Sequence, residues 1–77
     1  MKVSINNIAT KLVNELLNSE YKDFDMYKCI RSGVFSTLNI YFECDVTYFR
    51  VCTLVDREVK LINNELYSLI FPTVIHK

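Results

Sequence analysis

The chain has 77 residues, 51% of them apolar, and its nine basic and nine acidic residues leave no net charge. A chain of this length forms one domain with a small core, so we expect residues 1–77 to be a single domain. The balanced charge makes nucleic acid an unlikely partner, because domains that bind phosphates usually carry a basic excess. The sequence shows no signal peptide and no membrane-spanning stretch, which predicts a cytoplasmic protein without a membrane partner.

A helix is predicted over residues 4–19. Seven apolar residues recur at the spacing of one helical face: Ile5, Ile8, Ala9, Leu12, Val13, Leu16 and Leu17. Polar residues fill the opposite face, as in a helix that packs on a core with one side. Ser4 is well suited to cap the first turn. We expect Leu12, Val13 and Leu16 to be buried.

The next segment, residues 24–32, favours a second and shorter helix. Asp23 is a good N-cap, and Gly33, the only glycine in the chain, would end the helix in the left-handed conformation. The competing interpretation is a strand over residues 26–31 that turns at Gly33.

The central stretch, residues 34–55, is rich in Val, Ile, Thr, Tyr and Phe, which favour a pleated surface. Apolar and polar side chains also alternate in part of it. We therefore predict a β-hairpin, with strands over residues 34–43 and 46–54 and a tight turn near Cys44 and Asp45. The turn lacks the glycine or asparagine that two-residue hairpin turns prefer.

The last predicted element is a helix that begins at Asp56 as its N-cap and ends before Pro72. The residues after Pro72 would form a short strand or a frayed end. Together the elements give an α+β fold, in the order α-α-β-β-α or α-β-β-β-α, with a small antiparallel sheet packed against two or three helices. A small all-α bundle is the alternative.

Cysteine and histidine are the first residues to test for chemistry. Cys29, Cys44 and Cys52 are widely spaced and contain no closely paired zinc ligands, and His76 is the penultimate residue. We therefore expect no metal, no cofactor and no Cys–His catalytic pair, with the three thiols reduced and buried as small core residues.

The carboxylates give no catalytic pattern either. Several occur as i, i+2 pairs, whose members do not face each other on a helix: Asp23 with Asp25, Glu43 with Asp45, and Asp56 with Glu58. Caps and turns explain most of them. A single glycine also excludes a glycine-rich phosphate loop. We expect no catalytic residue and no enzyme.

The apolar surplus points to a contact with another protein. Both faces of the predicted hairpin carry large apolar groups, more than two or three short helices can cover. Aromatic residues and arginine are enriched at interface hot spots, and the best candidates are Phe35, Tyr41, Tyr48, Phe49 and Arg50. The commonest arrangement would be a two-fold homodimer.

The scarcity of glycine, alanine, proline and tryptophan beside abundant asparagine, isoleucine and lysine indicates an AT-rich genome. Small phage and mobile-element proteins fit this coding bias. We therefore expect a non-enzymatic protein-interaction module that binds and inhibits or modulates a host protein or defence system in the host cytoplasm. The alternative is a small nucleic-acid-binding or transcription-modulating domain, in which aromatic and basic side chains stack on bases.

Overall fold

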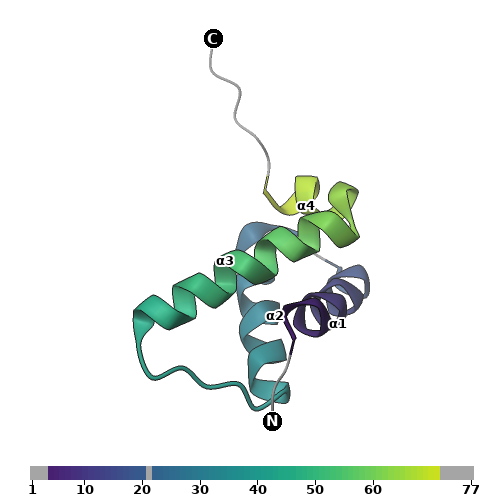
Figure 1. Ribbon diagram of the computed structural model, residues 1–77. Coiled ribbons are helices and arrows are strands. Elements are labelled where there is room, and N and C mark those ends of the chain that lie inside the picture. Colours follow the sequence, from purple (N-terminus) through teal and green to yellow (C-terminus); the bar gives the residue numbers. More distant parts are fainter. Residues whose placement is uncertain (1–3, 21, 72–77) are drawn as a thin grey trace.

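The computed structural model describes residues 4–20 and 22–71, and every regular element in this part of the chain is a helix. The helices are α1 (Ile5–Leu17), α2 (Phe24–Thr37), α3 (Asp45–Ile62) and α4 (Asn64–Ile70) (Figure 1). Helix α1 packs against both α2 and α3, and α4 packs against α3. None of these helices is long and apolar enough to cross a lipid bilayer.

Helix α1 confirms the first prediction. Ser4 caps it, and its hydroxyl oxygen accepts a hydrogen bond from the amide of Asn7 at 3.1 Å. The predicted core residues of its apolar stripe are buried: Leu12, Val13 and Leu16. Leu17 is an exception, because it lies at the edge of the stripe and is 53% exposed.

Helix α2 begins where the sequence predicts and ends later. Asp23 caps it, and its carboxylate accepts from the amide of Met26 at 2.8 Å. The prediction that Gly33 ends the helix is wrong, as are the predicted end at residue 32 and the competing strand. The helix runs on to Thr37, and Gly33 does not have a positive φ. The apolar side chains of Val34 and Phe35 are buried in the core, which favours continuing the helix past Gly33.

Asn39, and not Gly33, is the left-handed residue that ends α2. Its φ of 56° lies in the left-handed region, which asparagine tolerates better than most residues. The amide of Asn39 donates to the carbonyl of Ser36 at 3.0 Å, and the amide of Ile40 donates to the carbonyl of Phe35 at 2.8 Å. These two bonds form a Schellman motif, which satisfies the last carbonyls of α2.

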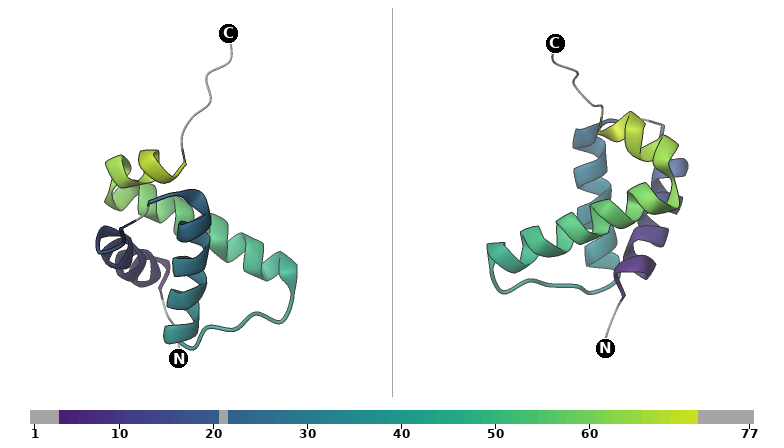
Figure 2. Two further views of the ribbon diagram at one scale, coloured as in Figure 1. Left: turned by 180° about the vertical axis from the view of Figure 1, so that it is seen from behind. Right: turned by 45° about the horizontal axis from the view of Figure 1, so that its top comes forward.

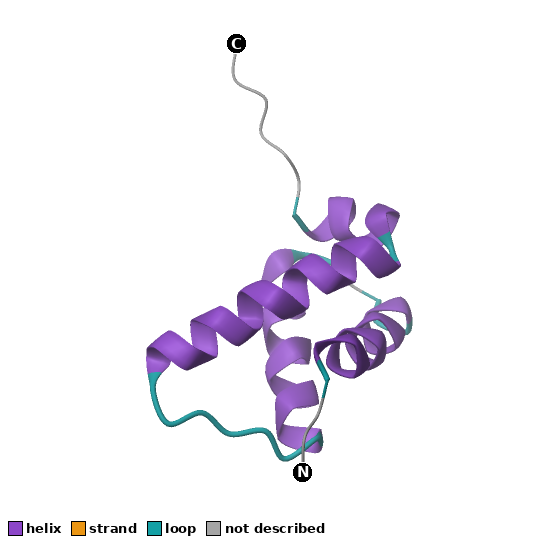
Figure 3. Ribbon diagram, in the orientation of Figure 1, coloured by secondary structure: helices purple, strands orange, loops and turns teal. Residues whose placement is uncertain are grey.

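The predicted β-hairpin is wrong, and with it the α+β fold. The range 34–37 belongs to α2, residues 38–44 form a connecting segment, and the range 45–62 is helix α3; no strand occurs in the described residues (Figure 3). The alternative all-α bundle is the architecture found. Residue composition gives only a weak preference for strand, and burial of Cys52, Val55 and Val59 along one helical face overrides it.

The predicted helix start at Asp56 is also wrong, because Asp56 lies in the middle of α3. The helix breaks instead at Asn63, whose non-helical backbone, with φ of −149° and ψ of 89°, separates α3 from α4. The side-chain oxygen of Asn63 accepts from the amide of Leu66 at 3.0 Å and caps α4. Residues 72–77, including Pro72 and the predicted C-terminal strand, lie outside the described residues.

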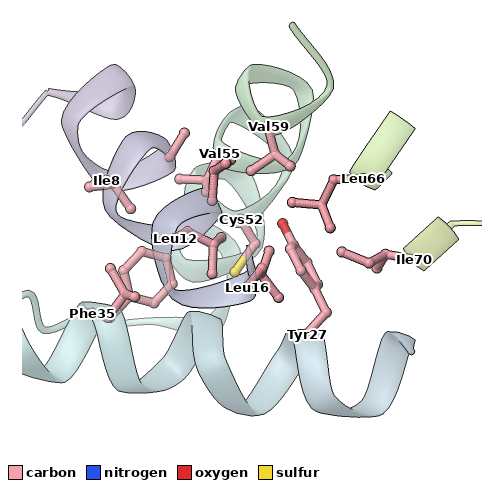
Figure 4. Close-up of a cluster of buried hydrophobic side chains, with 13 residues drawn as sticks. Ile8, Leu12, Leu16, Tyr27, Phe35, Cys52, Val55, Val59, Leu66 and Ile70 are labelled. Atoms are coloured by element: carbon pink, nitrogen blue, oxygen red, sulfur yellow. The ribbon is translucent and has the colours of Figure 1, made fainter. Parts of the chain in front are cut away.

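The core draws on all four helices. Its side chains meet between α1, α2 and α3, and α4 closes one end (Figure 4). The largest fully buried side chains are Leu12, Leu16, Tyr27, Val55, Val59 and Ile70. The first half of α3 extends away from α2. The 38–44 segment spans the distance from the end of α2 to the start of α3 (Figure 1 and Figure 2). One side of α3 therefore faces the core and the other is open to solvent.

Candidate interaction surface

The side of α3 that points away from the core forms an open, shallow hollow. Six residues line it, and we call them the α3 outer face: Val46, Phe49, Arg50, Thr53, Leu54 and Arg57. Their positions follow the i, i+3, i+4, i+7, i+8, i+11 spacing of one helical face. Cys52, Val55 and Val59 face the opposite way, into the core. Helix α3 thus carries apolar side chains on both sides.

Large apolar side chains on this face are uncovered. Val46 is 60% exposed, Phe49 is 63% exposed and Leu54 is 46% exposed. A single exposed apolar residue is ordinary in a soluble protein, but a contiguous group of them usually marks a contact site. The three residues line the same hollow, so they form one patch.

The charge of the outer face is positive. Arg50 and Arg57 lie on it, and neither makes an ion pair within residues 4–20 and 22–71. Two carboxylates on α3 accept hydrogen bonds from residues outside this face. Asp56 accepts from Arg31, and Glu58 accepts from the side-chain amide of Asn6 at 2.9 Å. The two guanidinium groups of the face are therefore available to a partner.

The structure separates the five residues that the sequence proposed as an interface. Phe49 and Arg50 lie side by side on the outer face. Tyr41 is in the 38–44 segment, 77% exposed, and lines two other surface hollows. Phe35 is buried in the core and Tyr48 is half-buried. The candidate contact surface therefore keeps Phe49 and Arg50 and loses Phe35, which a partner cannot reach.

Aromatic contacts link the buried and exposed residues of this group. The ring of Phe35 lies 5.2 Å from that of Phe42, and Phe42 lies 5.3 Å from Tyr48. Tyr48 in turn lies 5.5 Å from Phe49, and all three contacts are edge-on. Edge-on packing is a favourable geometry for aromatic rings. The chain of rings connects the buried Phe35 to the exposed Phe49 at the start of α3.

Sequence reasoning missed four residues of the outer face: Val46, Thr53, Leu54 and Arg57. The helical spacing that unites them with Phe49 is present in the sequence. The β-branched and aromatic composition conceals this spacing because it favours strands, and in a strand these residues would alternate between two faces. The predicted helix start at Asp56 also assigns Arg57 to a separate element.

A polar cluster lies at the other side of α3, next to the core. The Nη1 atom of Arg31 is 3.0 Å from both carboxylate oxygens of Asp56, and the hydroxyl of Tyr27 donates to the same carboxylate. The guanidinium carbon of Arg31 also lies 5.2 Å from the centre of the Tyr27 ring. The Nε of Arg31 is buried and has no hydrogen-bond partner among the described residues. The three side chains interact with one another and join α2 to α3.

The cluster shifts the proton affinities of its members. Burial, followed by the hydrogen bond to Asp56, raises the pKa of the Tyr27 phenol far above its ordinary value. Burial acts to lower the pKa of the Arg31 guanidinium. The charge of Asp56 and its hydrogen bond, with smaller contributions from Cys52 and Tyr27, together outweigh burial and raise this pKa. Both residues thus hold their protons, which suits a structural link between helices.

The thiols differ from one another in exposure. Cys52 is buried as predicted, whereas Cys29 and Cys44 are exposed, so the prediction of three buried cysteines is wrong for two of them. Burial raises the pKa of the Cys52 thiol, and hydrogen bonds with Thr47 lower that of the Cys44 thiol. No group of three or more metal-ligating residues gathers in the described part of the chain, and His76 lies outside it.

Comparison with known proteins adds no relative. No protein-family model, no curated protein and no solved structure matches the chain. The chemistry and geometry of its own residues are therefore the basis for the function proposed below.

Proposed function

We propose that the protein is a non-enzymatic protein-interaction module that binds its partner through the α3 outer face. The observation that carries the proposal is the exposure of Phe49 and Val46, at 63% and 60%, beside two arginines that form no ion pair with any described residue. Aromatic residues and arginine are enriched in protein interfaces, where a few such residues often dominate the binding energy. Their position on a continuous helix also gives the partner a rigid surface, because the opposite side of α3 is fixed in the core.

The proposal extends to the setting of the protein. An AT-rich coding bias supports a phage or mobile-element product that binds and inhibits or modulates a host protein. The exposed thiols of Cys29 and Cys44 are compatible with a reducing compartment such as the cytoplasm.

Self-association is a second use of the same face. The homodimer expected from the sequence would now place α3 against α3 of a second copy. Phe35 would take no part, since it is buried. The positive charge of the outer face opposes this pairing, because it brings the guanidinium groups of Arg50 and Arg57 from both copies together.

Nucleic-acid binding is the other candidate function, and one feature of the structure favours it. Arg50, Thr53 and Arg57 form a row along an exposed helix, with Phe49 next to them. Arginine and threonine can contact phosphates, and an exposed aromatic ring can stack on a base. The zero net charge of the chain is unfavourable for this function.

Affinity capture from the cells in which the protein is naturally made tests the main proposal. The tagged wild type is compared with a Phe49→Asp/Leu54→Asp variant and with a Lys11→Asp control on α1. Circular dichroism and thermal unfolding first establish that each variant is folded. We expect a discrete protein partner that the wild type and the control capture and the double variant loses.

Two results would count against the proposal. Equal capture by the wild type and the double variant would place the binding surface elsewhere. Capture of nucleic acid alone, sensitive to nuclease and weakened steeply by salt, would favour the alternative function.

A further inference from the structure

The outer face has a defined arrangement of charge and apolar surface. Val46, Arg50, Thr53 and Arg57 fall in one row along α3, and Phe49 lies to one side of it. Arg50 and Arg57 are seven residues apart, which is two helical turns or about 10.5 Å along the axis. A partner that covers this row therefore meets two positive charges at a fixed separation, with apolar surface beside them.

These charges restrict the partner. Neither Arg50 nor Arg57 forms an ion pair with a carboxylate in the described part of the chain. Covering a guanidinium group without a counter-charge is costly, because the charge loses its water and gains nothing in return. Covering it with a carboxylate gives a short, charge-assisted and often bidentate hydrogen bond. A purely apolar partner is thus disfavoured and an acidic one is favoured.

The same reasoning disfavours a second copy. Two outer faces in contact would bring together four guanidinium groups, and neither face supplies a carboxylate. The carboxylate of Asp56 is held by Arg31 on the core side, and Glu58 is bonded to Asn6. Like charges across an interface oppose association.

We infer that the α3 outer face binds an amphipathic helix of another protein, whose apolar side chains contact Phe49 and Leu54 and whose carboxylates, two turns apart, pair with Arg50 and Arg57. This inference rests on the proposed function and specifies the chemistry of its partner. The 18 residues of α3 span about 27 Å, enough for a partner helix of several turns. Recognition of an amphipathic helix by an apolar surface with flanking charge is a common mode of binding.

Three synthetic peptides test the inference directly. They share one amphipathic helical sequence with leucine on the apolar side and differ only at two positions seven residues apart, which carry glutamate, glutamine or lysine. Binding of each labelled peptide to the full chain is measured by fluorescence anisotropy at low and high salt. We expect the glutamate peptide to bind at least about tenfold more tightly than the glutamine peptide, and salt to reduce the difference.

Charge reversal on the protein provides the matched control. An Arg50→Glu/Arg57→Glu variant should lose the preference for glutamate and bind the lysine peptide best. A Lys11→Glu/Lys28→Glu variant makes the same change in net charge away from the outer face, and it should keep the preference of the wild type. If the peptide preference reflected only the net charge of the protein, both variants would lose the preference for glutamate equally, and this result would overturn the inference.

Other outcomes separate this inference from the proposed function. Equal binding of all three peptides, abolished by Phe49→Asp, would overturn the acidic partner and leave the outer face as a protein-binding surface. Failure of every peptide to bind would overturn the acidic helix as the occupant, while affinity capture would still test the proposed function. A dimer in light scattering that Phe49→Asp dissociates, or tighter binding to a DNA oligonucleotide than to the glutamate peptide, would replace the inferred partner.

Discussion

Arg31 on α2 contacts Asp56 on α3 through a single nitrogen, Nη1, that lies 3.0 Å from each carboxylate oxygen. The guanidinium side chain is buried and the carboxylate is mostly buried. Removing one member of such a pair leaves the other as an uncompensated charge. We expect Asp56→Ala to lower the free energy of unfolding by about 2–4 kcal/mol, measured by urea denaturation.

The exposed pair of Lys28 and Asp25 is the matched control, since its atoms are 3.7 Å apart on the surface of α2. Asp25→Ala should change stability little, because exposed pairs are weak. A double-mutant cycle with Arg31→Met and Asp56→Ala should give a clear coupling energy. Additive effects in this cycle would mean that the two side chains do not form the pair.

Alkaline pH should weaken the fold through Tyr27. Burial and the hydrogen bond to Asp56 raise the pKa of this phenol above the ordinary value of about 10. The folded protein then keeps a proton that the unfolded chain releases, so this contribution to stability is complete below about pH 10 and is lost as the pH rises further. Urea denaturation at several pH values should show the loss in the wild type.

Tyr27→Phe separates this effect from others. It keeps the ring and removes the titrating hydroxyl, so the decline in stability above about pH 10 should be smaller than in the wild type. Burial also raises the pKa of Cys52, but both proteins contain this thiol and its effect cancels in the comparison. If the free energy of unfolding depended on pH identically in the wild type and in Tyr27→Phe, the pKa of the Tyr27 phenol would not be raised in the folded state.

Gly33 distinguishes the observed helix from the one that the sequence predicts. It lies inside α2 with a helical backbone, and a Cβ atom there would meet nothing within 4 Å. Gly33→Ala should therefore raise the free energy of unfolding by about 0.5–1 kcal/mol. In the left-handed conformation the same change would be destabilising.

Replacement of Asn39 by alanine should be destabilising, unlike that of Gly33, because the φ of Asn39 is 56°. Asn39→Ala should lower the free energy of unfolding by about 1 kcal/mol, while Asn39→Gly should be tolerated. Thermal unfolding of the three variants measures all these effects. Destabilisation by Gly33→Ala together with no effect of Asn39→Ala would mean that α2 ends at Gly33.

Adjacent leucines at the end of α1 test the core. Leu16 is fully buried and Leu17 is about half exposed. Leu16→Ala should lower the free energy of unfolding by about 2–5 kcal/mol, because it leaves a cavity. Leu17→Ala makes the same chemical change and should have a much smaller effect. Equal losses at the two positions would contradict the assigned buried face.

The comparison of sequence and structure shows where local patterns suffice. Helix α1 could be predicted because its apolar spacing and its Ser4 cap are both contained in a short stretch of sequence. Helix α3 could not, because its residues favour strands locally and become helical through burial of Val55 and Val59 against distant parts of the chain. The role of Asp56 was hidden for a similar reason, since its partner Arg31 is 25 residues away.

The candidate site was predictable in part. Residue type alone predicts Phe49 and Arg50 as contact residues, because aromatic and arginine side chains are enriched at contacts. Leu54 and Arg57 were missed, since only a continuous helix places them on the same face. The prediction that Phe35 is exposed is wrong. The predicted hairpin places its side chain outside the core, whereas the helical bundle buries it.

Site-specific photocrosslinking at position 49 tests the central claim most directly. Phe49 is replaced by p-benzoylphenylalanine, and in a control protein the exposed Asn14 on α1 is replaced by the same residue. After irradiation in the cells in which the protein is naturally made, we expect a discrete adduct with another protein from position 49 and none from position 14. An adduct of twice the chain mass of 9.1 kDa would identify a second copy as the partner. Absence of any protein adduct at position 49, or equal adducts at both positions, would contradict binding through the α3 outer face.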